Sequence, residues 1–570
     1  MVQQEITIEP MTRLEGHLGV HANTDMDKKV YTDARCFGTM FRGWEIILKG
    51  REPADAIWIT QRTCGVCPTP HGIAAAMTVD MAYKAPPPPM GIAVRNLILG
   101  AEQLYDAALG CLILEGPDYS QAIVEKSNPD WWDAAKTTKS PHTENHGYAT
   151  IADIMTALNP ISGSLWQSSL AIGKVGRKMA SLLGAKHPHV NTLVPGGVAK
   201  TLTPTDLEQY AAMLAQNVAY AKQFIPVMDD LLDFVLSMGY EECGARENNM
   251  ISYGAYEDPT AYNAKYEDMA DWALKRAVSP GVIIDGELKT QDLVEINVGI
   301  QEMVESSYFD DWEGKMVEED PLGNPLTKYH PWNKITKPHP GAYGQWNSKY
   351  SWGTSVRWLD WKGSGELNTV ELGPIARMWA TAAGKLIPES TGSSVKFALP
   401  KATIVPYRNA DEMEFEWKVP EKVNTVERIR ARAYYYAYSA YVTYKMVLAG
   451  LGLVKDGKAK IWNKYKKAKN GLGVGLHEAM RGGVAHWCVM KNSHIENYQI
   501  MAPSTWNSGP KLGENDLGPY EAAIVGSPIS EAGELTGLDA VRTIRSFDPC
   551  LACSVQIFNG DDRIVHIPEI

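Results

Sequence analysis

Cysteine is scarce in this sequence, with 8 residues among 570. That number excludes a disulfide-stapled scaffold, which needs a far higher cysteine density. The sequence also lacks a run of 18 apolar residues, so no transmembrane helix is expected. Its first residues show neither the basic nor the apolar stretch of a secretory signal. We therefore expect a chain that becomes exported or membrane-associated through a partner that carries the signal, with a cytoplasmic location as the alternative.

Basic residues are also in the minority. The 55 Lys and Arg residues stand against 67 Asp and Glu residues, which gives a net charge of −12. This balance argues against a nucleic-acid binder, because such proteins present a basic surface. The chain has 45% hydrophobic and 21% charged residues, an ordinary globular composition, and is long enough for a deep core. It contains no repeat and no low-complexity linker, so we expect one large unit over residues 1–570.

Two helix starts carry capping signals. Thr205-x-x-Glu208, after a proline, and Asn424-x-x-Glu427 both have the spacing of a capping box. The expected long helices span 205–238, 424–450, 91–114 and 168–183, and the expected strands span 5–8, 18–21 and 564–567. The pattern predicts an α+β, predominantly helical fold, in which a central bundle of long helices carries small peripheral β-sheets.

Four of the cysteines form two C-x-x-C pairs, Cys64–Cys67 and Cys550–Cys553. The turn inside each pair lets both sulfurs converge on one metal ion. The pairs are separated by 482 residues (550 − 67 − 1), whereas a compact zinc module has roughly 15–20. Spacing alone leaves open a structural zinc site, a catalytic sulfur-bound metal and two unrelated pairs. Thioredoxin-type redox motifs are disfavoured because neither pair lies in a βαβ pattern.

The residues around these pairs form an ordered set of motifs. Arg62-x-Cys64-Gly65-x-Cys67-x-x-x-His71 surrounds the first pair, and Asp548-Pro549 precedes the second. Further blocks lie at 13–17 (RLEGH), 41–45 (FRGWE), 186–197, 371–377 and 497–507. The blocks follow one another from residue 13 to 556 in the order found in the large subunit of nickel–iron hydrogenases, which the chain resembles.

The resemblance implies a nickel ion held by all four thiolates. Cys64 and Cys550 would be terminal ligands, while Cys67 and Cys553 would also bind an iron that carries one carbon monoxide and two cyanides. Soft thiolates suit these metals. The implied reaction is the reversible heterolytic cleavage of H2 into protons and electrons, with H2 uptake as the expected direction.

The resemblance also assigns proton and charge roles. Cys550 would be the first proton acceptor and Glu15 the relay that follows it. Arg481 would lie over the open coordination position, oriented by Asp548 and by a second carboxylate, Asp118. The residues expected to line the cyanides, or to hydrogen-bond beside the ligands, are Ala502, Pro503, Ser504 and His71.

One departure from the family pattern concerns a magnesium ion. The family has histidine three residues after the last cysteine, where this chain has Gln556. We expect magnesium to be retained by Glu45, the backbone carbonyl of Ile500 and the amide oxygen of Gln556, since magnesium prefers oxygen ligands. The 14 residues after Gln556 (570 − 556) resemble the peptide that maturation proteins remove, and retention of this tail is an open alternative.

The remaining cysteines are Cys36, Cys111, Cys243 and Cys488, which form no iron–sulfur binding run. We expect them to be buried as small hydrophobic residues. Electrons must then leave through an obligatory iron–sulfur small subunit, to which membrane or electron-acceptor subunits could be added. Two alternatives remain, a hydrogen-sensing hydrogenase and a homologue of the quinone-site subunit of respiratory complex I. The latter has lost the nickel cysteines.

Overall fold

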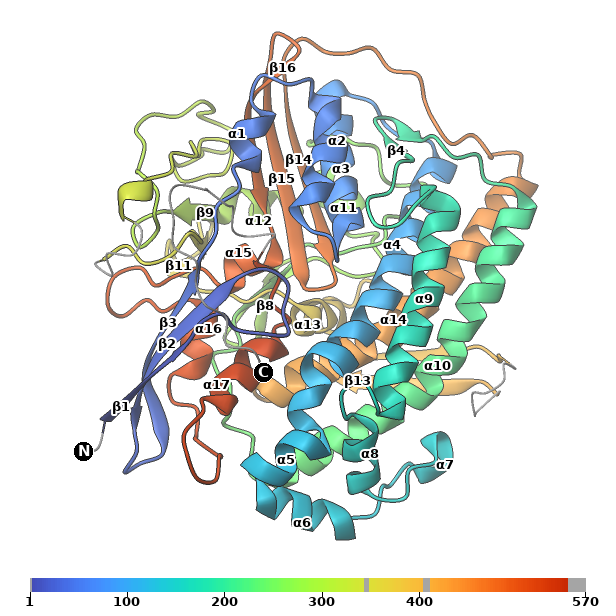
Figure 1. Cartoon of the computed structure of the whole chain (residues 1–570). Coiled ribbons are helices and arrows are strands. Elements are labelled where there is room, and N and C mark those ends of the chain that lie inside the picture. The colour runs from blue at the N-terminus through green and yellow to red at the C-terminus, as the bar shows by residue number, and fades with distance from the viewer. Residues whose placement is uncertain (1–2, 343–347, 403–410, 552–570) are drawn as a thin grey trace.

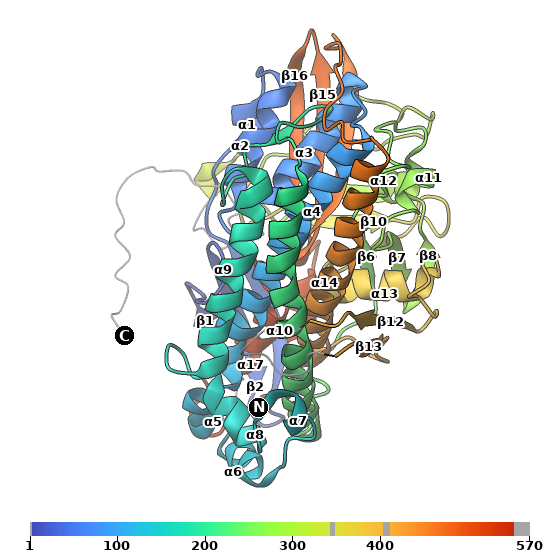
Figure 2. The same ribbon diagram turned by 90° about the vertical axis from the view of Figure 1, so that its right-hand side faces the viewer.

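The computed structural model describes residues 3–342, 348–402 and 411–551. Four long helices pack side by side along one side of the molecule (Figure 1), and a second view shows the bundle along its length (Figure 2). They are α4 (Pro89–Leu109), α9 (Ser164–Gly184), α10 (Pro204–Ser237) and α14 (Thr425–Lys455). The predicted bundle of long helices is confirmed.

The start of α10 differs from the prediction by two residues. Thr203 caps the helix, because its Oγ1 accepts a hydrogen bond from the Asp206 N–H at 3.1 Å, and Asp206 Oδ2 accepts one from the Thr203 N–H at 2.9 Å. The predicted box of Thr205 and Glu208 was wrong. Pro204 occupies the first helical position, where its missing N–H has no partner to lose.

The start of α14 agrees with the prediction. Asn424 Oδ1 accepts a hydrogen bond from the Glu427 N–H at 2.9 Å. The helix passes the predicted end at Gly450 and continues to Lys455. An interior glycine weakens a helix by only about 1 kcal/mol, so packing against the neighbouring bundle helices can carry α14 past this residue.

Small antiparallel sheets lie beside the bundle, as predicted. One contains β1 (Gln3–Ile8), β2 (Leu18–Asp25) and β3 (Val30–Gly38), which include two of the expected strands. Another contains β14 (Gly471–Ala479), β15 (Gly482–Lys491) and β16 (His494–Met501) and stands beside the upper end of the bundle in Figure 1. The strand expected at 564–567 lies outside the described residues.

Glycines bring helix α3 (Pro68–Tyr83) unusually close to strand β14. Every second residue of β14 faces α3, and every fourth residue of α3 turns its backbone carbonyl toward β14. Two strand residues span nearly the same length as one helical turn, so each glycine meets one carbonyl. A Cβ on these glycines would overlap the helix backbone: Gly475 with Ala74 O, Gly473 with Thr78 O and Gly471 with Ala82 O. This contact fixes the first cysteine pair, which precedes α3, against the sheet that carries Arg481.

We expect Gly475→Ala to lower the free energy of unfolding by about 1–3 kcal/mol, because the added methyl would collide with helix backbone rather than with a flexible side chain. Gly452→Ala is the matched control. Gly452 lies in α14 with open space around its Cβ direction, so alanine there should stabilise the helix by about 1 kcal/mol. Denaturant titration of both variants measures the difference. Equal stability of the two variants would contradict the close approach.

One segment, Pro89–Ser127, is long and apolar enough to cross a membrane by length and composition. It contains α4, and 83% of its most apolar 18-residue window is buried inside the protein. A buried core helix passes the same test of length and apolarity. In this fold the α4 part of the segment packs between α9 and α14.

Candidate metal centre

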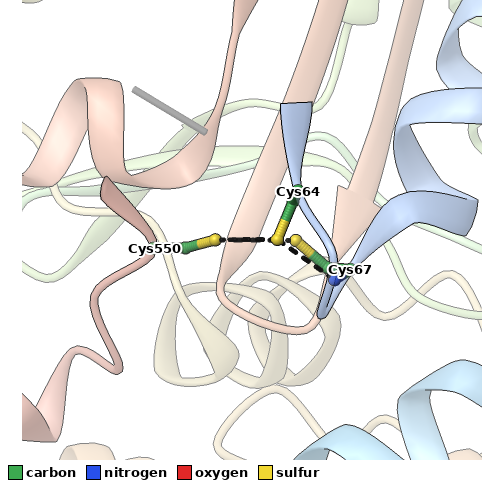
Figure 3. Close-up of side chains that lie close together, drawn as sticks. All are labelled: Cys64, Cys67 and Cys550. Carbon is green, nitrogen blue, oxygen red and sulfur yellow. Dashed lines mark hydrogen bonds between the residues drawn. The ribbon is translucent and has the colours of Figure 1, made fainter. Parts of the chain in front are cut away.

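Three cysteine sulfurs meet at one buried point. Cys64 follows a short 3-10 turn, Cys67 lies immediately before α3, and Cys550 follows α17 (Leu538–Ser546). The Sγ atom of Cys550 lies 3.2 Å from that of Cys64 and 3.8 Å from that of Cys67 (Figure 3). All three residues are buried. Cys553 lies outside the described residues, so its position stays a prediction.

The donors at this point suit a soft metal ion. The Cys64 Sγ accepts N–H groups from Val66 at 3.3 Å and from Cys67 at 3.2 Å, and such bonds favour the charged thiolate. Buried thiolates this close together repel one another unless a cation lies among them. Within the described residues, no other group of cysteine, histidine or acidic side chains has metal-ligand spacing. A metal held mainly by sulfur fits the three side chains.

Glu15 lies against the third of these cysteines. The Cys550 Sγ is 3.2 Å from Glu15 Oε2. Two backbone bonds hold the segments together, since Glu15 N–H donates to Pro549 O at 3.2 Å and Leu551 N–H donates to Glu15 O at 2.6 Å. The N-terminal RLEGH block and the C-terminal cysteine pair thereby form one local structure, and a proton could pass directly between the thiol and the carboxylate.

Arg481 lies in the turn between β14 and β15 and is fully buried. Its Nη1 and Nη2 donate to the two carboxylate oxygens of Asp106 at 2.8 and 3.1 Å. Its Nε lies 3.1 Å from Asp548 Oδ1. Burial raises the pKa of Asp106, and the Arg481 guanidinium acts against that rise. Two carboxylates therefore fix the guanidinium, as expected, but one of them is Asp106.

Asp118, the expected second carboxylate, contacts other cations. Its side chain pairs with Arg13 and accepts two bonds from Arg545 Nη1, at 2.7 and 2.9 Å. Burial acts to raise the pKa of Asp118, but Arg545 and Arg13 lower it below the ordinary value. The expectation was wrong because both aspartates lie on the same long segment, and only the helix rotation decides which one reaches Arg481.

Ala502, Pro503 and Ser504 lie at the start of the short helix α15 (Pro503–Asn507), and all three are buried. The Ser504 Oγ accepts the Cys550 N–H at 2.8 Å. This bond ties the helix start to Cys550 of the sulfur cluster. The residues expected to line the cyanides therefore border the sulfur cluster.

His71 belongs to a buried chain of polar rings. Its Nδ1 lies 3.0 Å from His486 Nε2, and His486 Nδ1 lies 2.9 Å from the Tyr498 hydroxyl. Burial lowers the pKa of His71 to about 4, so the ring is neutral at pH 7. The residue sits on the first turn of α3, and its contact with His486 fixes that turn against β15.

Glu45 and Ile500 are adjacent, as the expected magnesium site requires. The Glu45 Oε1 accepts the Ile500 N–H at 3.2 Å, and Thr336 donates to Oε2. The ammonium of Lys334 lies 3.6 Å from the same Oε2. Burial raises the pKa of Glu45, while Lys334 opposes the rise. Gln556, the third expected ligand, lies outside the described residues.

The fold and the site define a metalloenzyme subunit with a buried, thiolate-held centre. A sequence profile described as nickel-dependent hydrogenase matches residues 42–161 and 164–556, and one described as HoxL-like matches 5–36. The chain belongs to the nickel-dependent hydrogenase family as a large, catalytic subunit, an oxidoreductase with a nickel–iron centre.

Relatives support the same assignment over the full length. The hydrogenase-2 large chain of Escherichia coli K12 is 29% identical, with 99% of each chain covered. The periplasmic [NiFeSe] hydrogenase large subunit of Desulfomicrobium baculatum is also 29% identical, over 99% of this chain and 97% of that one. The solved actinobacterial-type NiFe-hydrogenase of Ralstonia eutropha H16 superposes with a TM-score of 0.94 at 38% identity, covering 97% of this chain and 100% of that one. The sensor and complex I alternatives are not favoured.

Proposed function

We propose that this subunit cleaves H2 heterolytically in the uptake direction, at a nickel–iron centre held by Cys64, Cys67, Cys550 and Cys553. The contact of 3.2 Å between the Cys550 sulfur and Glu15 carries the proposal, because it places a proton acceptor beside a metal-binding thiolate. A relative from Rhizobium leguminosarum, 28% identical, is an uptake hydrogenase large subunit.

The chain's own residues handle the proton and the charge. When bound, the nickel–iron centre would polarise H2 and supply the acceptor for its two electrons, and the two protons would leave one after the other by the same route. Cys550 takes the proton on Sγ and transfers it to Glu15 Oε2. Arg481 presents a fixed positive charge. Asp106 and Asp548 already hold its guanidinium, so it need not reorient during turnover. Cys550, Arg481, Asp106 and Asp548 are buried, which excludes bulk water from this side of the site, whereas Glu15 is half-buried.

The proposal extends to the finer composition of the centre, which the family resemblance implies. Ala502, Pro503 and Ser504 would line the cyanides of an iron that also carries carbon monoxide. Their place beside Cys550 supports this role. Glu45, the Ile500 carbonyl and Gln556 would hold magnesium. The adjacency of Glu45 and Ile500 supports that site.

The partner is an iron–sulfur small subunit that docks behind the first cysteine pair. A cavity of about 570 Å³ reaches the turn at Gly65 and Val66, and Lys174, Arg177 and Lys178 contribute positive charge to its wall. A negatively charged, thiolate-bound cluster suits such a basic site. The other cysteines, Cys36, Cys111, Cys243 and Cys488, are buried as expected, and the chain has no second sulfur-rich group among its described residues.

Metal analysis and infrared spectroscopy of the purified complex test this function. We expect one nickel and one iron per large subunit in addition to the partner's iron, together with bands of bound carbon monoxide and cyanide. Zinc as the sole metal would overturn the proposal. Intact mass of the same preparation decides whether residues 557–570 are retained, since cleavage after Gln556 removes 14 residues.

A further inference from the structure

Asp548, the second carboxylate on Arg481, lies between two buried guanidinium groups. Its Oδ1 is 3.1 Å from Arg481 Nε, and its Oδ2 is 3.7 Å from Arg432 Nε. Within the described residues neither oxygen accepts a hydrogen bond. The position of this carboxylate therefore depends on the two positive charges on either side of it.

The backbone at Asp548 does not fix the side chain by itself. Its φ is +55°, in the left-handed region that aspartate and asparagine tolerate better than most residues. Asparagine would satisfy this backbone equally well but would carry no charge. A carboxylate at this position is therefore explained by the pair of guanidinium groups and not by the turn.

Arg432 is itself held at three points. Its Nη1 pairs with Glu115 Oε1, its Nη2 donates to Ser546 O at 2.9 Å, and its Nε faces Asp548. Arg432 and Glu115 are both buried. The side chain thus links α14, the end of α17 and the segment that follows α4.

That segment is shaped to admit the Arg432 side chain. Residues 110–115 form a π-helix at the end of α4, and such irregular turns are enriched at functional sites. A Cβ on Gly110 would lie 3.0 Å from Arg432 Cδ and 3.1 Å from Asp548 Oδ2. The wider turn carries Glu115 to the guanidinium, and the glycine leaves room for the contact between Arg432 and Asp548.

The charges explain why both members of the pair are needed. Asp106, Asp548 and Glu115 are three buried carboxylates, and Arg481 and Arg432 are the two cations among them. Glu115 holds the Arg432 guanidinium in place, and without that guanidinium Asp548 Oδ2 would lose the positive charge on its side, so the attraction of Arg481 for Oδ1 would be left unopposed. Asp548 would then move relative to Arg481 Nε.

We propose that Arg432 and Glu115 form a positioning pair for Arg481, acting through Asp548. This inference rests on the proposed function, because it concerns the guanidinium placed beside the nickel–iron centre. In the described part of the chain, Arg432 bonds to Glu115 and Ser546 and faces Asp548, so we assign the pair a positioning role. It sets the angle of Arg481, which Asp106 alone fixes only at its Nη atoms.

The pair is tested with three variants, each in the complex with the partner subunit: Arg432→Lys, Arg432→Met and Glu115→Gln. We expect Arg432→Met to retain nickel and iron while kcat falls about 10- to 100-fold, the effect of a displacement near 1 Å at a reacting centre. KM should change little. Arg432→Lys and Glu115→Gln should show smaller losses in the same direction. The infrared bands should shift, and a cryo-EM structure should show the Arg481 guanidinium turned from its wild-type position.

Arg276→Lys is the matched control. Arg276 is equally buried and pairs with Glu257 at 2.6 Å, so this substitution perturbs a buried ion pair without moving Arg481. Arg432→Lys and Glu115→Gln decide the question if Arg432→Met fails to assemble. The proposal is overturned if both retain wild-type kcat, infrared bands and Arg481 position, or if Arg276→Lys changes these as much. Failure of the proposed function would appear in the wild-type complex itself, as missing nickel or missing infrared bands.

Discussion

Replacing Cys550 by serine is expected to abolish hydrogen uptake, with a loss of at least about 10⁴-fold, the scale on which removal of a reacting group acts. Serine replaces a soft, readily ionised thiolate by a hard hydroxyl, which is a poor ligand for nickel at neutral pH. Cys550 also provides the sulfur that lies 3.2 Å from both Cys64 Sγ and Glu15 Oε2. One substitution thus removes a metal ligand and the first proton acceptor.

Nickel per chain and hydrogen uptake are the measurements, and Cys243→Ser is the control. Cys243 is buried outside the centre, its Sγ lies 3.5 Å from Thr543 Oγ1, and burial raises its pKa to about 12. Its sulfur is therefore a neutral thiol, for which serine is a close substitute. We expect this variant to keep full nickel and activity. A Cys550→Ser enzyme with wild-type nickel and turnover would show that this thiolate is not a ligand.

Glu15→Gln is expected to lower uptake by about 10²- to 10⁴-fold, the usual contribution of general acid–base catalysis. The amide has nearly the same shape as the carboxyl group and can keep the contact with Cys550, but it cannot take up the proton. Metal content and infrared bands should therefore stay as in the wild type. This separates a proton-transfer defect from the loss of the centre expected for Cys550→Ser.

The isotope composition of the product gas sharpens this test. In heavy water, formation of HD from H2 requires the cleaved proton to reach solvent, so Glu15→Gln should suppress it together with uptake. Glu15→Asp restores the acid with a side chain shorter by one methylene group and should recover part of the rate. Unchanged HD formation in Glu15→Gln would show that the proton leaves through a group other than Glu15.

The sequence determined the class of this protein and most of its centre. Through the family resemblance, the ordered motif blocks assigned the four candidate nickel-binding cysteines, Glu15 and Arg481, and the structure brings Cys64, Cys67, Cys550 and Glu15 together. The cap of α14 was also readable, since Asn424 bonds to a residue only three positions away. Motifs and helix caps are local features, so a short stretch of sequence is enough to predict them.

Only the tertiary structure decided which side chains act together across the molecule. It brings Cys550 to Cys64 and Glu15 to Cys550, although the residues of each pair lie more than 480 positions apart in the chain. It also selects Asp106 over Asp118, a choice between two aspartates of one helical segment that depends on rotation through the π-helix at 110–115. Arg432 carried no motif signal, because its role lies in contacts made between separate elements. Residue types fix the chemistry that is available, whereas packing of α4, α14 and α17 fixes where it is placed.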